Sequence, residues 1–169
     1  MAERGPGEVR VRPAGEEDIP EAGALFELLD RFQSEWRVFT ARPTLRKEAE
    51  ARYRAALEDP DALLIVAEED SGRLVGMAFG RVEPISSISD ERVLDVSNVV
   101  VVPTRRRGGV ARRLLAFAAE FGRERGALRA SVKTYADNTA AMAFWRSVGF
   151  APRWVQMTAS IDELRAGAK

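Results

Sequence analysis

The stretch Val99-Val100-Val101-Val102-Pro103-Thr104-Arg105-Arg106-Arg107-Gly108-Gly109-Val110-Ala111-Arg112-Arg113-Leu114-Leu115 decides the fold more than any other part of this sequence. Its four consecutive valines predict a buried strand, and the apolar spacing after the turn predicts an amphipathic helix. A glycine-containing turn between a strand and a helix directs backbone N–H groups and the positive end of the helix dipole toward one point. The stretch therefore predicts an anion site, and its three neighbouring arginines suggest a polyanion such as a pyrophosphate.

The composition limits the classes of function. A chain of 169 residues is expected to form one domain, with loose ends at residues 1–7 and 164–169. The 26 basic and 26 acidic residues cancel, which argues against nucleic-acid binding by overall charge. Without Cys or His, the chain cannot form disulfides, Ser-His triads, thiolate nucleophiles or the usual zinc sites, so we expect no metal. No stretch has transmembrane length or resembles a signal peptide, which predicts a cytoplasmic protein without membrane contacts.

Hydrophobic periodicity predicts a mixed α/β (α+β) domain with a mostly antiparallel sheet. Asp18 is expected to cap the first helix, and Tyr53 falls on the apolar side of the second. The expected elements are strand 9–12, helix 19–32, helix 44–57, a hairpin of strands 63–67 and 74–82, a polar loop 86–92, strand 93–102, helix 110–125 stopped by Gly126, strand 128–134, a short helix 138–148 and strand 153–161.

The turn itself contains residues suited to close approach by a ligand. Gly108 and Gly109 remove Cβ atoms, while Val110 and Ala111 supply N–H donors from the first turn of the helix. The alternative reading is a solvated basic loop, but the position between a strand and a helix favours an anion site. The stretch matches neither a P-loop nor the three-glycine dinucleotide fingerprint.

A second segment, residues 138–150, begins with Asn138 and ends with Gly149-Phe150. A capped helix with a glycine C-cap would account for it structurally. Together, however, the two segments resemble the GNAT superfamily of N-acetyltransferases. The family signature Gln/Arg-x-x-Gly-x-Gly/Ala is met by residues 106–111, the preceding Val-x-Pro by residues 101–103, and the downstream Asn, aromatic and Gly-Phe by Asn138, Trp145 and Gly149-Phe150.

The resemblance implies a GNAT-like fold with about four helices and a sheet splayed at the cofactor strand. Acetyl-CoA would enter there as co-substrate, its pantetheine arm pairing with the valine strand and its pyrophosphate held by the turn amides. Asn138 would hydrogen-bond to the pantetheine, and the aromatic residues of the last helix would line the channel. The implied cofactor-binding residues are Val100, Val101, Val102, Arg106, Arg107, Gly108, Gly109, Val110, Ala111, Arg112, Asn138, Phe144 and Trp145.

The reaction implied by the resemblance is direct attack of a primary amine on the thioester, within a ternary complex. The absence of cysteine agrees with this, because no cysteine acyl-enzyme can form. The N–H of Val101 could polarise the carbonyl. The family often has a tyrosine where this chain has Trp145, and an indole is too weak an acid to replace it. Tyr135 lies ten residues upstream, at an expected strand end, and receives no role.

The family also often carries a carboxylate near the position of Asn98, which cannot take a proton. We therefore predict that Asn98 orients a water while Asp95, or Asp90 or Glu91, relays the proton. Strand alternation would place Asp95 and Asn98 on opposite faces, so that only one of them lines the cleft.

The acceptor site is predicted from two irregular segments. Residues 33–43 include Trp36, Phe39 and Arg42. Two interpretations of this segment are equally favoured: a substrate lid, or a loop that packs two aromatic side chains into the core. The acidic pair Asp90 and Glu91 would suit a cationic amine, either a small molecule or a protein or peptide amine. Family members are often dimers, so a homodimer is one expected assembly. The alternative function is a non-catalytic sensor or scaffold that binds acyl-CoA.

Overall fold

The computed structural model describes residues 8–37 and 39–167, so the expected tail at residues 1–7 lies outside the described residues. The chain divides into two compact units, Met1–Asn138 and Thr139–Lys169. No helix within the described ranges combines the length and the apolar character needed to cross a bilayer.

The first unit is a five-stranded sheet with helices on both faces. The strands follow the order β1-β2-β3-β4-β5, and every neighbouring pair is antiparallel except β4 and β5, which run parallel. This confirms the mixed α/β, mostly antiparallel prediction. The elements are β1 (Val9–Pro13), a 3-10 turn (Glu16–Asp18), α1 (Ile19–Gln33), α2 (Leu45–Leu57), β2 (Ala62–Glu69), β3 (Leu74–Ser86), β4 (Ser89–Val101), a second 3-10 turn (Pro103–Arg105), α3 (Val110–Glu124) and β5 (Ala127–Val132).

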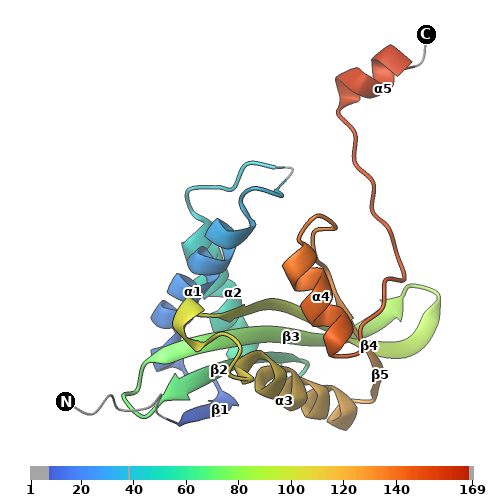
Figure 1. Cartoon of the computed structure of the whole chain (residues 1–169). Helices are drawn as coiled ribbons and strands as arrows, with labels where there is room; N and C mark the ends of the chain where they lie inside the picture. Colours follow the sequence, from blue (N-terminus) through green and yellow to red (C-terminus); the bar gives the residue numbers. More distant parts are fainter. Residues whose placement is uncertain (1–7, 38, 168–169) are drawn as a thin grey trace. The chain divides into compact units, whose positions relative to one another are not determined.

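Two hydrophobic clusters form the core, one on each face of the sheet. Helix α3 covers one face, where its side chains pack against β-strand residues that include Leu94 and Val96. Helices α1 and α2 cover the other face (Figure 1). The fully buried side chains of Tyr53 and Met77 belong to the cluster on that face. The amphipathic pattern that predicted the helix after the turn is therefore explained by burial on one side only.

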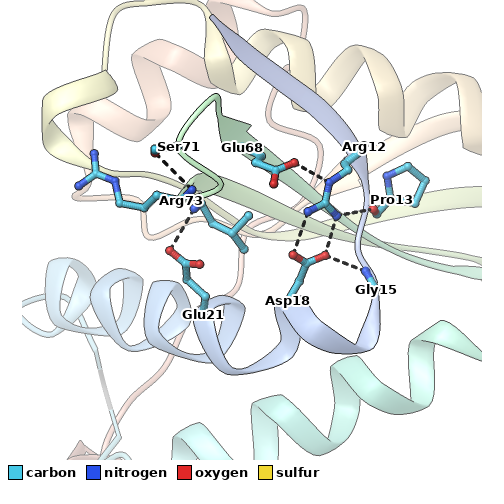
Figure 2. Close-up of polar contacts among 9 residues, drawn as sticks. Arg12, Pro13, Gly15, Asp18, Glu21, Glu68, Ser71 and Arg73 are labelled. Atoms are coloured by element: carbon cyan, nitrogen blue, oxygen red, sulfur yellow. Dashed lines mark hydrogen bonds and ion pairs between the residues drawn. The ribbon is translucent and has the colours of Figure 1, made fainter. Parts of the chain in front are cut away.

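Asp18 occupies the N-cap position of α1, as predicted, but its side chain makes no capping hydrogen bond to the helix. Its carboxylate instead accepts two hydrogen bonds from the guanidinium of Arg12, at 2.6 and 3.0 Å, and one from the Gly15 N–H at 2.7 Å (Figure 2). Arg12 also donates to Glu68 at 2.8 Å. Burial opposes ionisation of Asp18, but the bonds from Arg12 and Gly15 outweigh it and hold the Asp18 pKa below its usual value. This network ties β1 and the start of α1 to β2.

The polar loop predicted at residues 86–92 is wrong. Strands β3 and β4 form a long hairpin whose register runs to Ser86 opposite Ser89, so only Ser87 and Ile88 make the turn. Polar side chains are compatible with a strand whose faces are exposed, and the residues at this end of the hairpin are mostly exposed.

The second unit contains α4 (Thr139–Ser147) and α5 (Ile161–Gly167). Gly149 adopts a φ of 98° after α4, and the N–H of Phe150 donates to the carbonyl of Trp145 at 3.0 Å. The rings of these two residues meet edge to face at 5.2 Å. Together these contacts form a glycine C-cap, as the structural interpretation of the segment predicted.

The predicted strand at residues 153–161 is wrong. Residues 151–160 have no regular secondary structure and are exposed, with Trp154 94% accessible. Alternating side chains alone do not make a strand, because the backbone must also pair with a neighbouring strand. The loose tail predicted from residue 164 overlaps α5 as far as residue 167.

Candidate functional site

The sheet is open on one side of β4. Pairing between β4 and β5 ends at Val96 opposite Val132, whereas β4 continues to Val101 beside β3. Residues 97–101 therefore have no strand partner on the β5 side within the described chain. We call this backbone stretch the open edge. It corresponds to the splay that the family resemblance implied beside the valine strand, and an extended ligand could pair with it as a further strand would.

Val101 presents its backbone to the open edge. The N–H of Val102 donates to the carbonyl of Val75 on β3 at 2.9 Å, so the Val102 backbone faces β3. Because successive residues of a strand point their backbone groups to opposite sides, the N–H and carbonyl of Val101 face away from β3. In agreement, the Val101 carbonyl accepts a bond from Nε of Arg106 at 3.2 Å.

The open edge leads directly into the Arg/Gly turn, residues 103–109. Arg107 and Gly109 both have left-handed backbones, with φ of 65° and 77°. Left-handed residues within a tight turn bring successive N–H groups to one concave side, a geometry that suits an anion. The amides of Val110 and Ala111 add to it, since the first turn of a helix has no preceding carbonyls to bond. A Cβ placed on Gly109 would meet no atom within 4 Å, so the space beside it is open.

The three arginines of the turn differ in their contacts. Nε of Arg105 donates to Glu69 at 2.5 Å, and the two side chains are only 16% and 10% exposed. That hydrogen bond is the main reason that the pKa of Glu69 is low, and the pair fixes the turn to the end of β2. The Arg106 guanidinium lies 4.3 Å from the ring centroid of Phe32, whereas Arg107 is exposed. Arg105 is thus a structural residue, which leaves Arg106, Arg107 and the amides to face a ligand.

A bulge in β4 controls which side chains share a face of the sheet. Between Met77 opposite Val100 and Phe79 opposite Ser97, β4 contains one more residue than β3. Asn98 lies in this bulge with a φ of 52°, a conformation that Asn tolerates better than most residues. Consequently Val96 packs on the α3 side, while Val100 packs on the side of α1 and α2.

The bulge also brings Asp95 and Asn98 to the same face, which corrects the expectation from strand alternation. Asn98 Nδ2 donates to the hydroxyl of Tyr53, at 2.9 Å, on the face covered by α1 and α2. Asp95 lies between Leu94 and Val96, which point toward α3, so its side chain points to the opposite face and thus to the side of Asn98. There it accepts a bond from the Ser131 hydroxyl at 2.8 Å.

Tyr53 is a site residue that the sequence did not reveal. The helical pattern placed it among core residues, and it is indeed fully buried. Burial raises the pKa of its hydroxyl to about 12. The charge of Arg52 and the hydrogen bonds from Arg52 and Asn98 lower the pKa, but by less than burial raises it. The only signal in the sequence was a polar tip on an apolar helix face, where a buried hydroxyl needs a partner.

The fold does not place Asp90 and Glu91 near Asn98. Both are exposed and lie at the start of β4, in the hairpin that replaces the predicted loop. At about 3.3 Å per strand residue, Glu91 is roughly 20 Å along the strand from Asn98. Asp95 is therefore the only one of the three predicted relay residues that the fold places near Asn98.

The segment after α1 buries neither of its two aromatic side chains completely. Phe39 is 62% exposed and lies 5.9 Å from the guanidinium carbon of Arg37, so it is not packed into the core. Trp36 is half-buried, and exposed Arg42 pairs with Glu48 at 3.5 Å. The core-packing interpretation is wrong for Phe39, and the acceptor role of the segment stays a prediction.

The remaining expected cofactor residues lie near or within the second unit. The N–H of Asn138 donates to the carbonyl of Tyr135 at 3.1 Å. On α4, the rings of Phe144 and Trp145 meet edge to face at 5.2 Å. Their role in lining a cofactor channel stays a prediction.

Comparison with known proteins settles the family. The family model described as the acetyltransferase (GNAT) family matches residues 25–150, which is more than half of the chain. The chain belongs to the GNAT acetyltransferase family. The match includes the open edge, the Arg/Gly turn and the segment that ends with Gly149-Phe150.

This GNAT protein is similar to the uncharacterized N-acetyltransferase YhfO of Bacillus subtilis, with 27% identity over 143 residues that cover 84% of this chain and 89% of YhfO. A structure described as a predicted acetyltransferase from Clostridium acetobutylicum with acetyl-CoA has a TM-score of 0.72 at 16% identity and covers 92% of this chain and 98% of that one. The structure of AAC(6')-Iy with the bisubstrate analogue CoA-S-monomethyl-acetylneamine has a TM-score of 0.70 at 17% identity, covering 91% and 99%. At these identities, the two structures show the fold alone.

Proposed function

We propose that this GNAT protein transfers the acetyl group of acetyl-CoA to a primary amine by direct attack within a ternary complex. The observation that carries the proposal is the continuity of the open edge of β4 with the Arg/Gly turn. A long ligand with amide groups in one part and a pyrophosphate in another fits this order of backbone groups. The AAC(6')-Iy structure, which holds the bisubstrate analogue CoA-S-monomethyl-acetylneamine, supports an amine acceptor for a protein of this fold.

The backbone of Val100, Val101 and Val102 would pair with the pantetheine arm, and the amides of residues 107–111 would hold the pyrophosphate. Arg106 and Arg112 would add positive charge beside it, and Asn138 would bond to the pantetheine. Phe144 and Trp145 would line the channel.

In the chemical step, the amine nitrogen forms a bond to the acetyl carbon while the carbon–sulfur bond breaks. The sulfur leaves with the bonding electrons as the CoA thiolate, the nitrogen gives up its second proton to solvent after the attack, and the thiolate takes a proton from solvent. The N–H of Val101, which faces the open edge, would stabilise the negative charge that develops on the carbonyl oxygen. Asn98 would orient a water that takes the proton of the ammonium group, and Asp95 would relay it, since the bulge places both on one face.

The test is a thiol-release assay against a panel of primary amines, combined with calorimetric titration of acetyl-CoA. We expect acetyl-CoA to bind and at least one amine to release CoA. Binding without release across the panel would favour the alternative, a non-catalytic acyl-CoA sensor.

Gly109→Glu tests the cofactor site, because a carboxylate there would repel the pyrophosphate. Gly72→Glu is the matched control, since Gly72 also has a positive φ, 82°, with open space around its Cβ position, but lies in the turn between β2 and β3. Acetyl-CoA affinity should fall only in the Gly109 variant. Equal affinity in both variants would refute the assignment.

A further inference from the structure

Arg52 on α2 holds its guanidinium group over three aromatic rings. Its central carbon lies 5.7 Å from the ring centroid of Phe26, 5.4 Å from that of Tyr53 and 5.4 Å from that of Phe79. We call these three rings the aromatic platform. They come from α1, α2 and β3, so the fold converges on the arginine from three elements. Guanidinium groups stack favourably on aromatic faces, and the stacking orients the plane of the fork.

No carboxylate of the described residues forms an ion pair with Arg52, although the other two arginines of α2 are paired. Arg46 bonds to Glu50 at 2.8 Å, and Arg54 bonds to Glu16 at 2.6 Å. Three acidic residues of α1 and α2 have other partners. Glu27 pairs with Arg46, Asp30 pairs with Arg37, and Glu48, one turn before Arg52, accepts bonds from Thr44 and Arg42.

The guanidinium group of Arg52 is therefore held in one orientation and has N–H donors available for a ligand. A guanidinium group carries five N–H donors and no acceptor. Arg52 contributes a hydrogen bond to the buried Tyr53 hydroxyl, and its side chain is exposed to solvent. The remaining donors can bind a planar anion such as a carboxylate in a bidentate manner.

The position of Arg52 connects it to the reacting end of the site. Tyr53, whose ring forms part of the platform, accepts the hydrogen bond from Asn98 at the start of the open edge. Phe79, another platform ring, lies opposite Ser97 in the sheet, directly before Asn98. A small acceptor with its amine at the open edge would thus extend toward Arg52.

We propose that Arg52 binds a carboxylate of the acceptor, so that the substrate is a primary amine that also bears an anionic group. This inference rests on the proposed acetyl transfer and names its acceptor class. It differs from the expectation based on Asp90 and Glu91, which favoured a cationic amine, because those two residues lie far along β4 from Asn98, whereas Arg52 lies over the ring of Tyr53, the residue that Asn98 contacts. Polycationic amines would be repelled by Arg52 and would be poor acceptors.

The experiment compares matched acceptors in the full-length protein. A series of ω-amino acids of increasing chain length is measured against the unsubstituted alkylamines of equal length, by release of CoA. The variants are Arg52→Gln, which removes the charge, Arg52→Lys, which keeps the charge without the fork, and Arg54→Gln. Arg54 is the matched control because it lies on the same helix but pairs with Glu16 on the exposed surface.

We expect the amino acid of optimal length to exceed its alkylamine by about tenfold in kcat/KM in the unmodified protein, the effect of a charge-assisted hydrogen-bond pair. Arg52→Gln should abolish this difference mainly by raising KM, Arg52→Lys should retain part of it, and Arg54→Gln should retain all of it. Acetyl-CoA affinity should be the same in all variants.

Two results would overturn the inference. One is equal or better turnover of alkylamines and polyamines than of amino acids, with no effect of Arg52→Gln. The other is a loss of acetyl-CoA affinity in Arg52→Gln, which would assign the arginine to the co-substrate. If no amine of either kind releases CoA, the proposed acetyl transfer fails instead, so the two failures are distinguishable.

Discussion

The side-chain amide of Asn98 donates a hydrogen bond to the hydroxyl of Tyr53 across 2.9 Å, and this bond joins the bulge in β4 to helix α2. Tyr53 is fully buried, and burial raises its pKa to about 12, so the hydroxyl stays neutral at physiological pH. A buried, neutral hydroxyl cannot reach a substrate, but it can fix the direction of the Asn98 amide. We therefore regard Tyr53 as a positioning residue.

Tyr53→Phe should lower kcat/KM for the acceptor by up to about tenfold, which corresponds to one lost hydrogen bond. Acetyl-CoA affinity by calorimetry should not change. Tyr135→Phe, at the other tyrosine of the chain, is the matched control and should leave the rate unchanged. In a double-mutant cycle with Asn98→Ala, the effects should not add, because both changes break the same contact. Additive effects would contradict the positioning role.

Gly76→Ala should disturb the strand that carries the open edge. A Cβ on Gly76 would lie 2.9 Å from the carbonyl oxygen of Val100, so the backbones of β3 and β4 must move apart. We expect a loss of about 1–3 kcal/mol in the free energy of unfolding and a higher KM for acetyl-CoA. Gly80→Ala is the control on the same strand, since the nearest atom there is the flexible Cδ1 of Leu94 at 3.2 Å. An equal KM for acetyl-CoA in the two variants would argue against co-substrate binding at this edge.

Arg105 and Arg107 should respond differently to replacement by glutamine. Arg105→Gln breaks the half-buried pair with Glu69, so it should lower the melting temperature and weaken acetyl-CoA binding through a loosened turn. Arg107→Gln should leave the melting temperature unchanged, since Arg107 is exposed. It should weaken acetyl-CoA binding mainly at low salt, where exposed charges are least screened. A melting temperature lowered equally by both changes would be inconsistent with a structural role special to Arg105.

Asp18→Asn should destabilise the fold by about 2 kcal/mol near neutral pH, because it removes a carboxylate that is hydrogen-bonded to Arg12 and 7% exposed. The folded pKa of Asp18 lies below its usual value, so the stabilisation is complete above about pH 4 and is lost as the pH falls through the folded pKa. Urea unfolding at pH 7 and pH 3 should therefore show a smaller gap between variant and parent at pH 3. Glu16→Gln, which breaks the exposed pair with Arg54, should change nothing measurable. A gap that stays constant with pH would contradict this account.

The sequence by itself determined the main elements and the Arg/Gly turn. The valine run, the glycine turn and the amphipathic helix are local patterns, and their backbone conformations follow from residue types that lie next to one another. The positive φ angles of Gly109 and of Gly126, at the end of α3, are also local features, because glycine itself permits them. Local patterns were insufficient where a strand needs a partner, as at residues 151–160 and in the hairpin that replaced the polar loop.

Tertiary structure decided which side chains share the site. The bulge at Asn98 adds one residue to β4 only because of its pairing with β3, and this places Asp95, Asn98 and Tyr53 on one face. Arg52 lies over the ring of its neighbour Tyr53 and over those of Phe26 and Phe79, which are distant in sequence. Side-chain direction on a single strand or helix can be read from spacing, but the meeting of side chains from different elements depends on register and packing, which only the folded chain fixes.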